Sequence, residues 1–255
     1  MPHKQSQRIA VIYCAVLEVE IVHFARDIRN VIHTELLPQG LHQEPDKLRK
    51  TVQEAIDRIE AQLHPTAIVL GYGLCSRGTE GVTTKSAVLV VPRAHDCITV
   101  LLGSRKTYAA YVAAHPGTYW YSPGWNKHVL MPGKERYEKL YDEYVEKYGK
   151  EDGEYLMEAE QHWFRAYDRA TYVDLGVGAT PEDVDRTRQC AEWLNWTFDR
   201  HPGDPALLED MLRGNWDDDR FLVLEPGQTL EMTIDEDVIR AAIPPGASSE
   251  TEKTQ

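Results

Sequence analysis

Short apolar runs alternate with longer amphipathic segments along most of the chain, and this alternation predicts strands and helices in turn. Apolar runs at 8–13, 66–71 and 87–91 predict strands, and a strand over 31–37 ends at the turn residues Pro38, Gln39 and Gly40. The segment 45–63 is predicted to be a helix, because its apolar residues recur at spacings of three and four and Pro45 suits a first helical turn. A helix is also predicted after the first strand, over 16–25.

The second half of the chain continues the alternation around one charged block. Two helices are predicted between 96 and 114, followed by a strand at 118–121. Residues 133–168 are rich in Tyr, Glu and Lys and predict two helices, with a break marked by Gly149 and Gly153. Beyond this block the pattern predicts strands at 172–175, 196–199 and 221–224, with helices opening at Thr180 and Pro205.

Strands and helices that alternate through short connections predict an α/β fold with a mostly parallel, Rossmann-like sheet flanked by helices. We expect a single α/β domain over 1–243, with a helical insertion at about 133–168, and a disordered tail over 244–255, which has no apolar residue after Ala247. Right-handed crossovers allow the first four strands a flavodoxin-like 2-1-3-4 order or a split, Rossmann-like order.

Composition narrows the possible partners. The chain has 255 residues, and its 28 Lys and Arg against 41 Asp and Glu give a formal net charge of -13, with the acid spread along the chain. This charge argues against a nucleic-acid partner. No apolar run approaches the ~20 residues of a membrane span and no signal peptide is recognisable, so we expect a cytoplasmic protein without a membrane partner.

Three of the four cysteines follow predicted strands. Cys14, Cys75 and Cys97 come directly or within a few residues after the runs at 8–13, 66–71 and 87–91. The carboxyl ends of parallel strands lie at one edge of a sheet, where α/β proteins bind their ligands. We therefore expect three thiols to gather at the ligand edge, in a chain whose reduced cysteines are metal ligands or catalytic groups rather than disulfides.

Soft thiolates select zinc, cuprous copper or iron–sulfur clusters, so the trio predicts a metal centre. His95, two residues before Cys97, is a candidate fourth ligand of a zinc site. Three cysteines without a fourth ligand instead suit a [4Fe–4S] cluster with one open iron. The sequence does not distinguish zinc from a [4Fe–4S] cluster.

Charged residues and glycines around these cysteines suggest further roles. Arg77 and Arg93 are expected to lower thiolate pKa values and to neutralise an anionic substrate, and with His95 and Asp96 they form the predicted catalytic set. Gly71, Gly73 and Gly78 are the predicted cofactor-binding residues, allowing positive φ angles or close approach to whatever Cys75 binds. The loop lacks the spacing and the Gly-Lys-Ser/Thr ending of nucleotide-binding loops.

Two other interpretations of the cysteines remain open. They could be small buried packing residues, the role that we expect for Cys190. Alternatively, Cys75 or Cys97 could be a nucleophile with His95 as base, in a metal-free enzyme. His42 follows the turn after the second strand and could face the same crevice.

Three segments of the chain resemble a known family. Gly71 to Gly78, Pro92 to Ile98, and His115 to Tyr119 with Gly124-Trp125 are similar to the hallmark segments of the domain of unknown function 1638 family, an uncharacterised family. The resemblance extends from the first strand to about Leu224, and it implies a cysteine after the first strand, as Cys14 is here. It also implies an association with corrinoid-dependent methyl transfer.

The sequence therefore predicts a protein that holds a metal or iron–sulfur centre and acts on a small molecule in sulfur or one-carbon (methyl) metabolism. One alternative is a non-catalytic accessory protein that binds a corrinoid protein, and the other is the metal-free cysteine-nucleophile enzyme. The sequence does not settle whether the protein is an enzyme.

Overall fold

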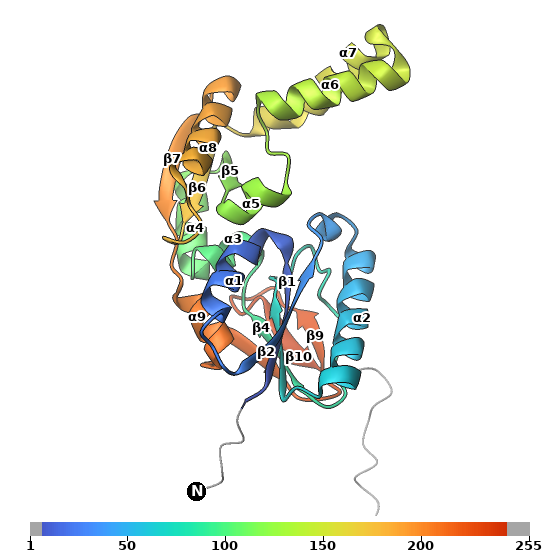
Figure 1. Ribbon diagram of the computed structural model, residues 1–255, viewed down its shortest axis with the longest axis vertical. Coiled ribbons are helices and arrows are strands. Elements are labelled where there is room, and N and C mark those ends of the chain that lie inside the picture. Colours follow the sequence, from blue (N-terminus) through green and yellow to red (C-terminus); the bar gives the residue numbers. More distant parts are fainter. Residues whose placement is uncertain (1–6, 244–255) are drawn as a thin grey trace, which may run out of the picture.

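The computed structural model describes residues 7–243, and it confirms a mixed α/β fold with mostly parallel strands (Figure 1). The strands form a mostly parallel sheet, a second sheet that is entirely parallel, and a hairpin. A five-stranded sheet has the order β2-β1-β3-β4-β8, a three-stranded sheet has the order β5-β6-β7, and β9 and β10 form an antiparallel pair.

The five-stranded sheet holds the most buried part of the chain. Its first four strands are parallel and follow the flavodoxin-like order 2-1-3-4, and β8 adds to β4 in antiparallel fashion. Every residue of β1 and β3 is buried, as expected for central strands covered on both faces. The strands are β1 (Ile9–Cys14), β2 (Val31–Leu37), β3 (Ala67–Gly71), β4 (Val88–Pro92) and β8 (Phe221–Leu224).

Helices cover both faces of this sheet. The apolar stripe of α2 packs Leu48, Val52 and Ile56 into the core, and α2 begins at Pro45 and ends at Leu63, as the periodicity predicts. The 3-10 helix η1 leads directly from β1 into α1, so the predicted helix over 16–25 is interrupted at its start. The helices around this sheet are η1 (Ala15–Leu17), α1 (Glu18–Ala25), η2 (Leu41–Gln43), α2 (Pro45–Leu63), α3 (Cys97–Leu101) and α9 (Ala206–Arg213).

The three-stranded sheet has its own small core around Tyr121 and Tyr172. All its strands are parallel, and α8 packs against β6 and β7. The sheet lies beyond the carboxyl ends of the first sheet's parallel strands, with α4 and α5 at the junction (Figure 1). Its elements are α4 (Arg105–Ala114), β5 (Thr118–Tyr121), α5 (Pro123–His128), β6 (Arg169–Asp174), α8 (Pro181–Leu194) and β7 (Thr197–Pro202).

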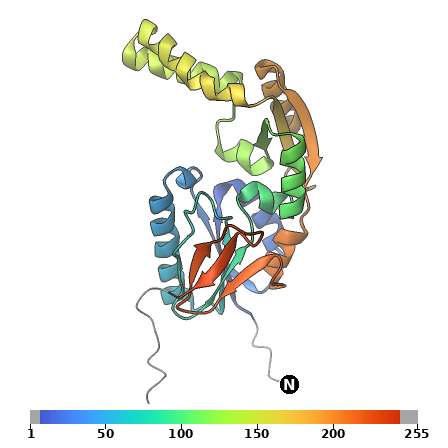
Figure 2. The ribbon, with the colours of Figure 1, turned by 180° about the vertical axis from the view of Figure 1, so that it is seen from behind.

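The charged block forms a helical arm, α6 (Lys134–Tyr148) and α7 (Lys150–His162), followed by the 3-10 helix η3 (Trp163–Ala166). Its two long helices pack against each other and project away from both sheets (Figures 1 and 2). Gly149 separates them, as predicted, but Gly153 lies inside α7, where it packs against Val145.

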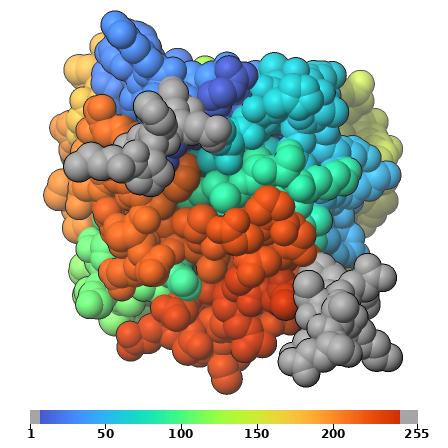
Figure 3. All heavy atoms as spheres, turned by 90° about the horizontal axis from the view of Figure 1, so that it is seen from below, coloured from blue at the N-terminus to red at the C-terminus, as the bar shows by residue number. Residues whose placement is uncertain are grey.

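The hairpin of β9 (Thr229–Met232) and β10 (Ile239–Ala242) is an addition that the sequence pattern did not predict. The backbone of Leu230 hydrogen-bonds with Gly81 and Val82, in the segment between β3 and β4. Seen from below, the red surface of these last strands lies against the green and cyan surface of the middle of the chain (Figure 3). The predicted tail at 244–255 lies outside the described residues.

No helix within residues 7–243 is both long enough and apolar enough to span a bilayer.

Candidate functional site

The three cysteines predicted to converge do so at the carboxyl edge of the five-stranded sheet. Cys14 is the last residue of β1, Cys75 lies in the loop after β3, and Cys97 is the first residue of α3, which follows β4. All three are buried free thiols, and the Cys97 side chain hydrogen-bonds with both Cys14 and Cys75. The sheet order β1-β3-β4 brings them together because these three strands are neighbours.

Cys75 is held by an unusual backbone conformation. Cys75, Ser76 and Arg77 have φ angles of 46°, 56° and 67°, so three consecutive residues with side chains are left-handed. The left-handed region costs a residue with a Cβ roughly 1–2 kcal/mol, and such strain gathers at functional sites. The turn is closed by a hydrogen bond of 2.9 Å from the Gly78 N–H to the Cys75 carbonyl.

The strained turn is anchored on the neighbouring loop. The backbone N–H groups of Leu74 and Cys75 donate to the carbonyls of Ala94 and His95, at 2.8 and 3.0 Å. These bonds tie the loop after β3 to the loop after β4, so the positions of Cys75 and Cys97 are fixed relative to each other.

Hydrogen bonding shifts the pKa values of Cys14 and Cys97 in opposite directions. The hydrogen bond from Cys97 lowers the pKa of the Cys14 thiol, against the effect of burial, and the Val16 N–H and the Tyr72 hydroxyl contribute in the same direction. The pKa of Cys97 is raised, first by its hydrogen bonds with Cys14 and Cys75 and then by burial. Cys14 therefore ionises more readily than Cys97, whose S–H donates a hydrogen bond to the Cys14 sulfur.

Tyr72 is a member of the site that the sequence analysis did not identify. Its side chain is only 2% exposed, and its hydroxyl lies beside Cys14 without any other hydrogen-bond partner among residues 7–243. Burial, followed by the nearby thiols, raises the pKa of Tyr72, so the hydroxyl remains a donor. A buried donor with no other partner next to sulfur is suited to stabilise a thiolate or a sulfur ligand.

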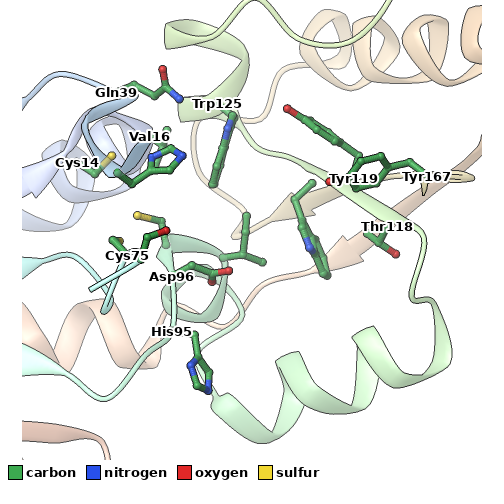
Figure 4. A pocket seen from close by; sticks show the side chains of 15 residues that line it. Cys14, Val16, Gln39, Cys75, His95, Asp96, Thr118, Tyr119, Trp125 and Tyr167 are labelled. Atoms are coloured by element: carbon green, nitrogen blue, oxygen red, sulfur yellow. The ribbon is translucent and has the colours of Figure 1, made fainter. Parts of the chain in front are cut away.

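The cysteines open onto a cavity of about 420 Å³ (Figure 4). Its far wall is aromatic and comes from the second sheet and its surroundings: Tyr119 and Trp120 from β5, Trp125 from α5, and Tyr167. The cavity thus lies between the thiol edge of one sheet and an aromatic wall provided by the other, a location typical of ligand sites.

Two histidines line the cavity: His42 faces it, as the sequence suggested, whereas His95 does not reach the thiols. His95 is exposed, and its side chain points away from the sulfur atoms of Cys14 and Cys75 (Figure 4), so the structure does not bring it to the thiols as a fourth ligand or base. His42 is half-buried in the cavity lining, and burial lowers its pKa. At neutral pH His42 is a neutral imidazole, able to accept a proton or bind a metal.

Asp96 lines the cavity and also begins α3. Its Oδ1 accepts hydrogen bonds from the Thr99 N–H at 2.8 Å and from the Thr99 hydroxyl at 3.0 Å. This cap fixes the start of the helix at Cys97. Of the four predicted catalytic residues, Asp96 and His95 line the cavity.

The structure does not bring the two predicted arginines to the cysteines. Arg77 is exposed and pairs with Glu80, with 2.8 Å between Arg77 Nε and Glu80 Oε2. Arg93 donates to the backbone carbonyls of Asp218, Asp237 and Ile239, so it fastens the C-terminal hairpin to β4. Neither arginine belongs to the cavity lining.

The role of Arg93 can be tested by its effect on stability. We expect Arg93→Ala to lower the free energy of unfolding by about 2–3 kcal/mol, because it removes charge-assisted hydrogen bonds and leaves their carbonyls unpaired. Arg77→Ala, which breaks an exposed ion pair, should cost at most about 1 kcal/mol. Urea unfolding of the two variants measures both, and an equal small loss would contradict the fastening role.

Packing within the chain leaves no room for a side chain at Gly71, Gly73 and Gly78. A Cβ on Gly71 would lie 2.6 Å from the Cβ of Tyr13, and one on Gly73 would lie 2.6 Å from the backbone nitrogen of Asp96. A Cβ on Gly78 would lie 2.5 Å from Leu48. The positive φ angles expected at these glycines occur instead at the three residues that start with Cys75.

Within residues 7–243, no group of three or more His, Cys, Asp and Glu side chains has the arrangement of a metal site. The thiols hydrogen-bond in pairs through Cys97, and Cys190 is half-buried on α8, away from this cavity, as the sequence suggested.

Comparison with known proteins gives one match. A family model described as a protein of unknown function (DUF1638) matches residues 36–212. No curated protein and no solved structure matches the chain.

Proposed function

The chain belongs to the DUF1638 family of proteins of unknown function, and we propose its function from the cavity that the cysteines line. In this proposal Cys14, Cys75 and Cys97 hold a soft metal ion or an iron–sulfur cluster at the floor of the cavity. A small molecule then reacts in the space between this centre and the aromatic wall. The small molecule belongs to sulfur or one-carbon metabolism.

The observation that carries this proposal is the meeting of three thiols from three separate segments, one of them held in a strained turn. A packing role alone does not account for a turn of three consecutive left-handed residues, a kind of backbone strain that clusters at functional sites. Three thiolates leave one coordination position of a zinc ion or of a [4Fe–4S] cluster open. Cys75 lines the cavity beside Cys97 and Ser76, so that position would face the space available to a substrate.

The residues around the trio fit this role without supplying a positive charge. The Tyr72 hydroxyl and the Val16 N–H donate toward the Cys14 sulfur, as donors around metal-bound sulfur do. His42, neutral at pH 7, is available as a further ligand or as a proton acceptor for the bound molecule.

The metal centre is tested by purifying the protein anaerobically and measuring zinc, iron and acid-labile sulfide together with the visible absorption spectrum. We expect about one zinc ion or one cluster per chain, and loss of most of it in each of Cys14→Ser, Cys75→Ser and Cys97→Ser. Cys190→Ser is the matched control and should keep the full content, because Cys190 lies outside the cavity. Full metal content in any one of the three variants would contradict the proposal.

A second function is supported by the lowered pKa of Cys14. A thiol that ionises readily beside a cavity is a candidate nucleophile, with Cys97 and Tyr72 as its hydrogen-bond donors. The lowered pKa of Cys14 and the raised pKa of Cys97 make Cys14 a better candidate than Cys97. The metal analysis separates the two functions: protein that holds no metal when prepared anaerobically would favour the nucleophile. The accessory role with a corrinoid protein remains a prediction from the family resemblance.

A further inference from the structure

The aromatic wall of the cavity is the part of the site that thiol chemistry does not explain. Tyr119, Trp120, Trp125 and Tyr167 all line it, and each is only partly buried, so part of each side chain remains uncovered. Trp125 stands across the cavity from Cys14, and Tyr119 and Tyr167 lie together beyond it (Figure 4). The rings come from three segments, β5, α5 and the residue before Asp168, which the second sheet holds next to one another.

The second observation concerns the charged side chains around the cavity. No Lys or Arg is among the described residues that line it, whereas the Asp96 carboxylate is. The nearest predicted cations, Arg77 and Arg93, are engaged elsewhere, with Glu80 and with backbone carbonyls. In a chain of net charge -13, such a cavity disfavours phosphates and carboxylates, which need a cation or a cluster of donors.

Aromatic rings attract cations through the negative potential of their faces, and tryptophan does so best. Quaternary ammonium groups are recognised in this way, by several aromatic side chains and a nearby carboxylate, because they carry charge but have no N–H to donate. A wall of two tryptophans and two tyrosines with one carboxylate, and with no Lys or Arg among the described residues of the lining, matches this requirement.

We propose that the cavity binds an organic cation with a compact apolar head, a quaternary ammonium or sulfonium group, which lies between the aromatic wall and the cysteines. The inference rests on the proposed function in that the cation is the small molecule acted on at the thiol centre. Thiolates or an anionic thiolate–metal centre would add to the attraction of such a cation. The aromatic wall and Asp96 act without the metal, so binding does not require a loaded centre.

The test compares choline with 3,3-dimethylbutan-1-ol, which has the same shape but a carbon in place of the charged nitrogen. Calorimetry and the quenching of tryptophan fluorescence measure the dissociation constants on metal-free and metal-loaded protein. We expect choline to bind at least about 10-fold more tightly than the neutral alcohol in both preparations. Equal affinity for the two molecules, or binding of neither, would overturn the proposal.

Two variants and one control locate the binding. Asp96→Asn removes the charge but keeps an oxygen that can cap α3, so we expect a folded protein whose affinity for choline falls about 5-fold while that for the alcohol is unchanged. Trp125→Leu should lower choline affinity about 10-fold. Trp193→Leu is the control, because Trp193 is on α8, outside the cavity, and 41% exposed. Choline affinity that is unchanged in both Asp96→Asn and Trp125→Leu would also contradict the proposal.

The result is separable from that of the metal analysis. Protein that binds choline selectively but holds no metal would retain the organic cation and reject the metal centre. Protein that holds metal but does not distinguish choline from its neutral analogue would retain the metal centre and reject the organic cation.

Discussion

When the pH rises from 5 to 8, the Glu20→Gln variant is expected to gain about 2.5 kcal/mol of stability relative to the native chain. Glu20 lies on α1, is 0% exposed, and neither of its carboxylate oxygens has a hydrogen-bond partner among residues 7–243. Burial, and then the nearby Asp183 carboxylate, raises its pKa from the usual 4.5 to about 7. A charged carboxylate in this position is therefore unfavourable.

The direction of the pH dependence follows from this raised pKa. Below about pH 4.5 the carboxyl is protonated in both the folded and the unfolded chain, and its effect on stability does not change with pH. Between pH 4.5 and 7 the unfolded chain loses this proton while the folded chain keeps it, so stability falls as the pH rises. Well above pH 7 the full loss is reached, which at roughly 1.4 kcal/mol per pKa unit amounts to about 3.5 kcal/mol, and about 2.5 kcal/mol of this falls between pH 5 and pH 8.

The charged and titratable groups near Glu20 do not offset this effect. Asp183 on α8 accepts hydrogen bonds from the Tyr172 hydroxyl at 2.5 Å and from the Asn126 amide at 2.8 Å. Its negative charge adds to the unfavourable environment of Glu20. Glutamine has nearly the same shape as the protonated acid and does not ionise, so the variant lacks this pH dependence.

Urea unfolding of the native chain and of Glu20→Gln at pH 5 and pH 8 gives the four free energies required. Glu54→Gln is the matched control, since this exposed residue of α2 forms a long ion pair with Lys50 and should leave the pH dependence unchanged. If Glu20→Gln and the native chain differ equally at the two pH values, the carboxyl is ionised in the folded protein and the prediction is wrong.

Much of the fold could be predicted because its elements carry strong local signals. The helix at 45–63 and the strands at 31–37, 118–121 and 221–224 have the predicted bounds, since their periodicity and their flanking turn residues agree. The direction of β8 could not be predicted, because an apolar run has the same pattern whether its neighbour is parallel or antiparallel. The division into two sheets depends on contacts between segments distant in sequence, for which a single sequence carries no local signal.

The gathering of the cysteines could be predicted from the sequence, whereas the directions of the neighbouring side chains could not. The gathering of Cys14, Cys75 and Cys97 follows from strand order, which a topological rule supplies. The side-chain directions of His95 and Arg93 depend on how each loop turns, and proximity in sequence to Cys97 was a poor guide to them. Tyr72 lies between Gly71 and Gly73, in the glycine-rich loop that also holds Cys75. Its phenol within that loop is the sequence signal that could have identified it as part of the site.

A methyl group added to Gly124 is expected to lower the free energy of unfolding by about 3 kcal/mol or more. Gly124 lies in α5, and a Cβ there would be 2.0 Å from the carbonyl oxygen of Val16 and 2.6 Å from its carbonyl carbon. This contact joins α5, which carries Trp125, to η1, which follows Cys14. The clash is with backbone, so no side-chain rotation relieves it.

The loss in Gly124→Ala should appear despite the better helix propensity of alanine, which by itself would stabilise a helical position by up to about 1 kcal/mol. Gly149→Ala is the comparison, because Gly149 has open space around its Cα but φ and ψ angles of 85° and 169°, which residues with a Cβ rarely adopt, so only a backbone cost of about 1–3 kcal/mol is expected there. Separation of α5 from η1 also widens the gap between the cysteines and the aromatic wall, so Gly124→Ala should weaken choline binding by at least about 10-fold, whereas Gly149→Ala should not. Urea unfolding and choline titration of both variants check this, and a Gly124→Ala protein as stable as the native chain would show that η1 and α5 are not in contact in solution.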